Sequence, residues 1–206
     1  MPRLQLPACD AARRNARRLF LGSIRLILSP FALLVVSLVA ASAPRARAAE
    51  ISEFEVKAAA LVNIVGFVEW PATAFANPEA PLVIGVLGRD RVVSLLEDLA
   101  ATEKSHGRRI ALEHYATPAE ARSCHVLYVA QTAHARWPGM RSQFVGRPVL
   151  TVSDAPNFAR QSGIVQFAIE RNKLRLIVNL GAARLAGLTI SSKVLRLADV
   201  VGDSAR

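Results

Sequence analysis

The side chains that most often bind metals or act as nucleophiles are few and scattered in this sequence. Its four histidines show no HExxH motif and no paired spacing of the kind that holds zinc, and only two cysteines occur. No G-x-S-x-G, G-x-G-x-x-G or P-loop motif is present. Because nothing places a nucleophile beside a base, we expect a protein that is not an enzyme and that has no metal and no cofactor. The histidines are His106, His114, His125 and His134.

One short segment has the composition of an anion-binding turn. The run "GVLGRD" places Gly88 and Arg89 between a predicted strand and a predicted helix, with Arg91 just behind. Free backbone amides and the helix dipole favour an anion there, and ligands of open α/β sheets gather at the carboxyl ends of strands. A ligand site at Gly88, Arg89 and Arg91 is therefore one hypothesis. A tight turn in which Asp90 caps the helix and the arginines are solvated is the simpler interpretation, and we favour it.

A second candidate site lies where the first predicted helix ends, at Phe67, Glu69 and Trp70. Tryptophan is among the residues that dominate binding energy at protein interfaces. We therefore predict a partner-binding surface at these three residues. Trp70 is equally suited to cover the core and to fix the helix on a sheet, and the sequence favours neither role.

The helix that leads to this site is unusually apolar. Ser52 and Glu55 have the spacing of a capping box, and Pro71 is expected to end the helix at Val68 or Glu69. Eleven of the fifteen residues from Phe54 to Val68 are apolar, more than the single stripe of a surface helix. Such a helix must be covered on two sides, and we expect the sheet on one side and a second subunit or a partner on the other.

The middle of the chain alternates between short apolar runs and helical patterns. This alternation predicts a parallel sheet with right-handed crossovers. The predicted strands are residues 81–88, 108–115, 125–131 and 147–154, and the predicted helices are residues 90–100, 117–122 and a segment from 132 that Pro138 interrupts.

The pattern changes after residue 154. Two more strands flank Arg171-Asn172, a two-residue connection typical of a hairpin, so we expect an antiparallel addition at one edge of the sheet. A final helix is predicted from about Ser192, with Val194, Leu195, Ala198 and Val201 on one face. The fold expected is a single three-layer α/β domain, with a mostly parallel sheet, a C-terminal antiparallel hairpin and flanking helices.

The N-terminal residues 1–48 read as a signal peptide. Six arginines precede an apolar run of fifteen residues, Leu26 to Ala40, and Ala46-Arg47-Ala48 offers a cleavage site. That run is shorter than the roughly 20 residues that a membrane-spanning helix needs. An uncleaved N-terminal anchor is the alternative, and Ser29, Pro30 and Ser37 within the run weigh against it.

Export changes what the charge and the cysteines mean. Eight of the 26 basic residues and one of the 16 acidic residues lie before Ala49, which leaves 18 and 15 and lowers the net charge from +10 to +3. Residues 49–206 therefore give no support to nucleic-acid binding. Cys9 leaves with the signal peptide, so Cys124 has no intrachain partner. It is most simply a small buried residue, and an intermolecular disulfide is the alternative.

Several separate motifs of the mature chain carry a family resemblance. The most specific are the Glu69-Trp70-Pro71 helix end, the segment "VLTVSDAPNFA" followed by Gly163, and the run "IVNLGAARLAGLTISSKVLRLA". Together with "VIGVLGRD" and "CHVLYVA" they extend over residues 53–201. In this order they resemble the YfiR-like family of bacterial periplasmic proteins.

The resemblance implies a function that the residues alone do not. It implies a periplasmic regulator, often a homodimer, that represses an inner-membrane diguanylate cyclase by binding its periplasmic domain. Outer-membrane lipoproteins can sequester such a repressor and release cyclic di-GMP synthesis. Some members of the family carry several cysteines, and Cys124 alone cannot provide an intramolecular redox switch. A periplasmic small-molecule-binding sensor, with its ligand beside Arg89, is the alternative function.

Overall fold

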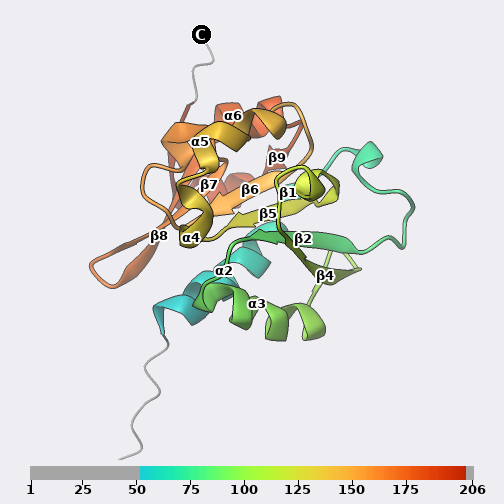
Figure 1. Ribbon diagram of the computed structural model, residues 1–206, viewed down its shortest axis with the longest axis horizontal. Coiled ribbons are helices and arrows are strands. Elements are labelled where there is room, and N and C mark those ends of the chain that lie inside the picture. The colour runs from blue at the N-terminus through green and yellow to red at the C-terminus, as the bar shows by residue number, and fades with distance from the viewer. Residues whose placement is uncertain (1–51, 203–206) are drawn as a thin grey trace, which may run out of the picture. The chain divides into compact units, whose positions relative to one another are not determined.

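The computed structural model describes residues 52–202 (Figure 1). The predicted signal peptide of residues 1–48, its cleavage site and Cys9 lie outside these residues. Across the described part of the chain, no helix combines the length and the apolar character that crossing a membrane requires.

Helix α2 (Glu53–Val65) begins at the predicted capping box. The Ser52 hydroxyl accepts a hydrogen bond from the Glu55 amide at 3.2 Å, and the Glu55 carboxylate accepts one from the Ser52 amide at 2.9 Å. These two bonds satisfy amides that have no partner within the helix.

The predicted end of this helix, at Val68 or Glu69, is wrong. The helix stops at Val65, and residues Val68–Glu69 form strand β1, which pairs antiparallel with β9 (Thr189–Ile190). The Ser191 amide also donates to the Phe67 carbonyl at 2.9 Å. A distant segment thus pairs with residues 67–69, and so the chain leaves the helix before Pro71 can end it.

The predicted parallel sheet is confirmed. β2 pairs in parallel with both β4 and β5, β5 with β6, and β6 with β7, and the full order is β10-β8-β7-β6-β5-β2-β4-β3. The order of the strands reverses between β2 and β5, where ligands of such sheets usually bind. The strands are β2 (Leu82–Leu87), β3 (Lys104–Ser105), β4 (Arg108–Tyr115), β5 (Val126–Val129), β6 (Leu150–Ser153), β7 (Val165–Glu170), β8 (Lys173–Asn179) and β10 (Ala198–Val201).

The predicted hairpin is present as β7 and β8. Its two connecting residues, Arg171 and Asn172, have φ values of 50° and 59°, as the tight turn of a twisted hairpin requires. The hairpin does not form the edge of the sheet, however. Strand β10 pairs in parallel with β8 on its outer side.

Strand β10 replaces most of the predicted C-terminal helix. Helix α7 (Ser192–Leu195) is a single turn, and Ala198–Val201 is extended. The prediction of one helical face therefore fails, because the backbone groups of this segment pair with the otherwise open edge of β8. An ion pair between Arg175 and Asp199, 3.2 Å apart, links the two strands.

Helices cover both faces of the sheet, which confirms the three layers (Figure 1). α2 and α3 pack on the face that presents Ile84, Val86 and Tyr128, and α4 and α5 pack on the face that presents Leu87 and Val129. The remaining helices are α3 (Arg91–Thr102), α4 (Gln131–His134), α5 (Trp137–Met140), α6 (Leu180–Leu185) and four 3-10 turns at Ala72–Ala74, Glu120–Ser123, Arg141–Gln143 and Ala159–Gln161.

Candidate functional site

The structure separates the three residues of the predicted partner-binding surface. In the extended segment after α2, Phe67 and Glu69 are exposed, whereas Val68 is fully buried and Trp70 is half-buried. This is the alternation of a strand with one face on the core. Phe67 and Glu69 therefore share the outer side of β1, and Trp70 turns towards the domain.

Trp70 is held in a cluster of rings. Its indole NH donates to the His125 carbonyl at 3.3 Å, and its ring lies 6.4 Å from Phe75 and 6.2 Å from His106, both edge to face. The guanidinium of Arg108 lies 4.0 Å from the centre of the Phe75 ring. Trp70, Phe75, His106 and Arg108 line a shallow pocket of about 300 Å³ together with Glu69 and Val68.

His125 fixes this cluster to the sheet. Its Nδ1 accepts from the Val83 amide at 3.0 Å, so the proton is on Nε2, which donates to the Ala74 carbonyl at 3.0 Å. The ring also stacks on Phe75 at 4.3 Å. Burial lowers the pKa of His125, and the charge of Arg108 lowers it further, against the raising effect of the Ala74 hydrogen bond. The imidazole is therefore neutral at neutral pH.

The second candidate site is the turn between β2 and α3. Asp90 caps the helix as predicted, because its Oδ1 accepts from the Val93 amide at 3.1 Å. The Arg89 amide donates to the Thr132 hydroxyl at 3.0 Å. Gly88 has φ of 89°, and a Cβ there would lie 2.6 Å from the same hydroxyl oxygen. The turn is thus tied to the neighbouring βα connection.

The two arginines of this site point to different surroundings. Arg89 is exposed, and the guanidinium of Arg91 lies 4.9 Å from the centre of the Phe54 ring in α2. Residues Gly88, Arg89 and Arg91 are therefore neighbours in the fold, as expected from the sequence, and a ligand site there stays a prediction.

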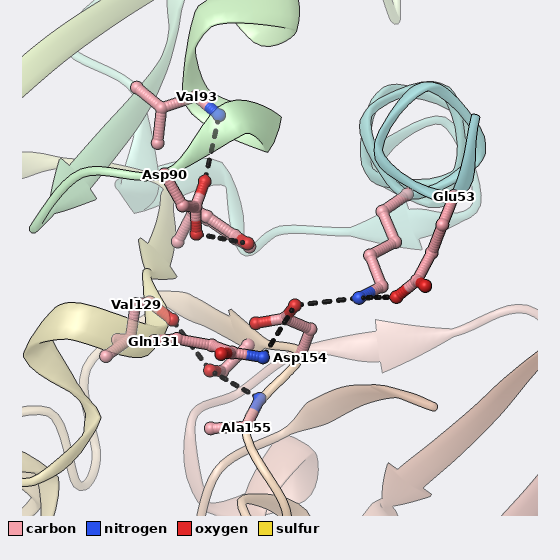
Figure 2. Close-up of polar contacts among 10 residues, drawn as sticks. Glu53, Asp90, Val93, Val129, Gln131, Asp154 and Ala155 are labelled. Carbon is pink, nitrogen blue, oxygen red and sulfur yellow. Dashed lines mark hydrogen bonds and ion pairs between the residues drawn. The ribbon is translucent and has the colours of Figure 1, made fainter. Parts of the chain in front are cut away.

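Beside this turn, a network of charged side chains joins α2 to the carboxyl ends of the strands (Figure 2). Asp154 accepts from the Lys57 ammonium at 2.8 Å and from the Gln131 amide at 3.3 Å, and Lys57 also pairs with Glu53. The side chains of Lys57 and Asp154 are only 6% and 4% exposed. The second carboxylate oxygen of Asp154 is buried without a hydrogen-bond partner among residues 52–202.

Burial, hydrogen bonds and charges together shift two pKa values in this network. Burial raises the pKa of Tyr128 far above its ordinary range, and the nearby charges of Asp154 and Asp90 add to the effect; its hydroxyl donates to Asp90 at 3.0 Å. Burial alone would lower the pKa of Lys57, but hydrogen bonds to Asp154 and Glu53 and their charges outweigh it and raise the pKa. Lys57 is therefore charged and Tyr128 neutral, and the network positions α2 on the sheet.

Sequence reasoning missed the residues that hold both candidate sites in place, namely Lys57, Phe75, His125, Tyr128 and Asp154. One signal was available. Lys57 is a lone cation in a helix that is apolar on nearly every side, and Asp154 ends a buried strand at the edge where ligands gather. A buried charge needs a partner, so the two could have been paired.

The thiol of Cys124 and the side chains that could bind a metal are the other groups capable of chemistry. Cys124 is buried, its thiol lies 3.0 Å from the Ala121 carbonyl, and burial raises its pKa to about 12. These facts favour a small buried residue over an accessible thiol. Within residues 52–202, no group of three or more His, Cys, Asp or Glu side chains is placed to hold a metal ion.

Comparisons with known proteins identify the family of this chain. None of the curated proteins matches the chain significantly. A solved structure of a conserved domain protein from Vibrio cholerae is similar at 16% identity with a TM-score of 0.49, over 72% of this chain and 60% of that one. This chain thus spans less than two thirds of the length of that protein. A family model described as YfiR/HmsC-like matches residues 54–199, from the first turn of α2 into β10, and the chain belongs to the YfiR/HmsC-like family.

Proposed function

We propose that this protein is a non-enzymatic periplasmic regulator that binds the periplasmic domain of an inner-membrane diguanylate cyclase and represses it. The observation that carries the proposal is the YfiR/HmsC-like match over residues 54–199. Membership of this family is consistent with a role as a regulator of diguanylate cyclases. The predicted signal peptide, with cleavage near Ala48, would deliver the domain to the periplasm. A homodimer and sequestration by an outer-membrane lipoprotein belong to the same proposal.

The surface proposed for the cyclase is the outer side of β1. Phe67 is 41% exposed, and an exposed aromatic side chain beside an exposed carboxylate, Glu69, suits an interface anchor with a charged neighbour. The Phe67 backbone accepts a hydrogen bond from the Ser191 amide and donates one to the Ile64 carbonyl, and a change of its side chain leaves both bonds in place. Replacing its side chain should therefore affect binding more than folding.

The test compares cyclic di-GMP levels in cells. Deleting the gene should raise cyclic di-GMP, and the wild-type gene should restore the low level. Phe67→Ser should restore it poorly, whereas Leu197→Ser, at another exposed apolar side chain (77%), should restore it fully. Unchanged cyclic di-GMP in the deletion strain would refute repression, and full activity of Phe67→Ser would refute the surface.

A small-molecule sensor is the second candidate, and one observation favours it, at a pocket whose lining includes none of the residues Gly88, Arg89 and Arg91 of the predicted ligand site. A pocket of about 300 Å³, at the low end for ligand sites, is lined by Trp137, Phe144 and Leu185, with Arg141 beside them. Thermal-shift screening against metabolites tests this function, because a ligand that binds only the folded state raises the melting temperature. Ala182→Phe, which fills the pocket, should abolish any shift that arises there.

A further inference from the structure

Helices α2 and α3 leave an apolar groove of about 580 Å³ between their outer faces. Val56, Ala59 and Ala60 line it from α2, and Leu95 and Leu99 line it from α3. All five side chains are only half-buried within the described chain. The alanines matter because small side chains allow another helix to approach closely.

The groove follows from the composition of α2. The opposite side of this helix is fully buried, with Leu61 and Val65 at 0% exposure in the core. The sheet and α3 together cover that side, but they do not cover the side that presents Val56, Ala59 and Ala60. Some of the apolar side chains of this helix are thus left partly exposed by the domain. A contiguous exposed apolar surface marks an interaction site.

The charged residues along the groove are acidic. Glu55 and Asp98 are exposed carboxylates that line it, and among the residues that line it there is no lysine or arginine. The nearest arginine at the start of α3, Arg91, lies over the ring of Phe54. Since residues 49–206 carry more basic than acidic residues, this acidic border is a local feature of the groove.

The charges decide between two occupants. A second copy that packed groove to groove would present the same surface, because a two-fold interface is self-complementary. It would bring Glu55 and Asp98 of both copies together without a cation between them. A helix with basic residues beside its apolar stripe would pair with both carboxylates instead.

We propose that the α2–α3 groove binds an amphipathic helix of a partner protein, with its apolar face in the groove and lysine or arginine side chains against Glu55 and Asp98. This is the helix-in-groove mode of recognition. The groove is lined by residues 55–63 of α2, about 13 Å of helix, so it accommodates about two to three turns of a partner helix. The proposal depends on the proposed function in one respect only, which is that the binding partner is a protein.

The test uses a defined peptide, so that it does not depend on knowing the partner. A fluorescein-labelled helical peptide of about 16 residues carries a leucine and alanine stripe flanked by lysines, and a second peptide carries glutamates in place of the lysines. Each is titrated against the protein purified from expression of the full-length gene, with fluorescence anisotropy as the readout. The basic peptide is expected to bind about tenfold tighter at low salt, with a smaller ratio at high salt.

Matched variants locate the binding site. Ala59→Arg should weaken binding of the basic peptide about tenfold or more by filling the groove with a like charge, and Ala101→Arg, at an exposed position of α3 outside the groove, should not. Asp98→Asn should weaken it about twofold to fivefold, and Glu97→Gln, which faces His114 instead, should not. Circular dichroism confirms that each variant is folded.

Three results would overturn the proposal. These are equal binding of the two peptides, tight binding to Ala59→Arg, or a dimer that Ala59→Arg converts to a monomer in sedimentation, which would make a second copy the occupant. None of them bears on repression of the cyclase, which the cyclic di-GMP measurements test separately.

Discussion

At the scale of single residues, two buried polar side chains fix the candidate sites. His125 links β2 to the turn at residue 74 through both ring nitrogens and stacks on Phe75, which places the ring cluster of Trp70. Lys57 links α2 to the end of β6 through Asp154. The contacts of His125 require the neutral imidazole, and those of Lys57 require the charged ammonium. Each side chain therefore makes the stability of the fold depend on pH.

The lowered pKa of His125 predicts a loss of stability in acid. The unfolded state binds the proton at its ordinary pKa of 6.5 and the folded state only at lower pH, so this contribution is complete above pH 6.5 and falls as the pH drops through the folded value. Urea unfolding at several pH values should show this slope. It should shrink in His125→Asn, whose amide can also accept and donate, but not in His114→Asn, at an exposed histidine. An unchanged slope in His125→Asn would contradict the assignment.

The Lys57 and Asp154 pair predicts a large cost when one partner is removed. Lys57→Met leaves a buried carboxylate without its cation and should lower the free energy of unfolding by about 3–5 kcal/mol, and adding Asp154→Asn should recover part of the loss. Arg175→Met breaks an exposed pair and should cost about 0–1 kcal/mol. Because the pKa of Lys57 is raised, its contribution is present below pH 10.5 and is lost as the pH rises through the folded value. Equal costs for Lys57→Met and Arg175→Met would contradict this account.

At the scale of elements, the sequence predicted the helix caps and the hairpin turn, because neighbouring residues determine these features. The capping box at Ser52, the cap at Asp90 and the hairpin at Arg171-Asn172 all lie where the sequence indicates them. The errors occur where a distant strand supplies the hydrogen bonds. Strand β1 depends on β9 and strand β10 depends on β8, and neither partner can be recognised from the segment itself.

The turn after β2 offers a test of how tightly elements are joined. Gly88 and Gly107 have φ values of 89° and 75°, but only at Gly88 would a Cβ meet other atoms, at 2.6 Å from the Thr132 hydroxyl. Gly107→Ala should cost about 1 kcal/mol in unfolding free energy from its backbone conformation, and Gly88→Ala should cost clearly more. Adding Thr132→Ala to Gly88→Ala should recover part of the excess. Equal costs at the two glycines in chemical denaturation would show that the contact does not matter.

At the scale of the whole molecule, the sequence predicted the fold class better than the site. The alternation of strands and helices needs only the hydrophobic pattern, and it gave the parallel sheet and its three layers. A site is an arrangement of residues from distant segments, so the ring cluster of Trp70, Phe75 and His125 could not be assembled before the topology was known. The high number of apolar residues in α2 could be seen in the sequence, but the groove that this helix forms with α3 could not.

The central claim is that this domain regulates by binding a membrane-bound diguanylate cyclase and catalyses nothing itself. The most direct measurement is an affinity pull-down from detergent-solubilised envelope with the tagged protein, produced from its full-length gene, as bait and mass spectrometry of the eluate. The account predicts recovery of an inner-membrane protein with a cytoplasmic cyclase domain, reduced with Phe67→Ser as bait. Repeated recovery of no such protein, even after mild cross-linking, would contradict it.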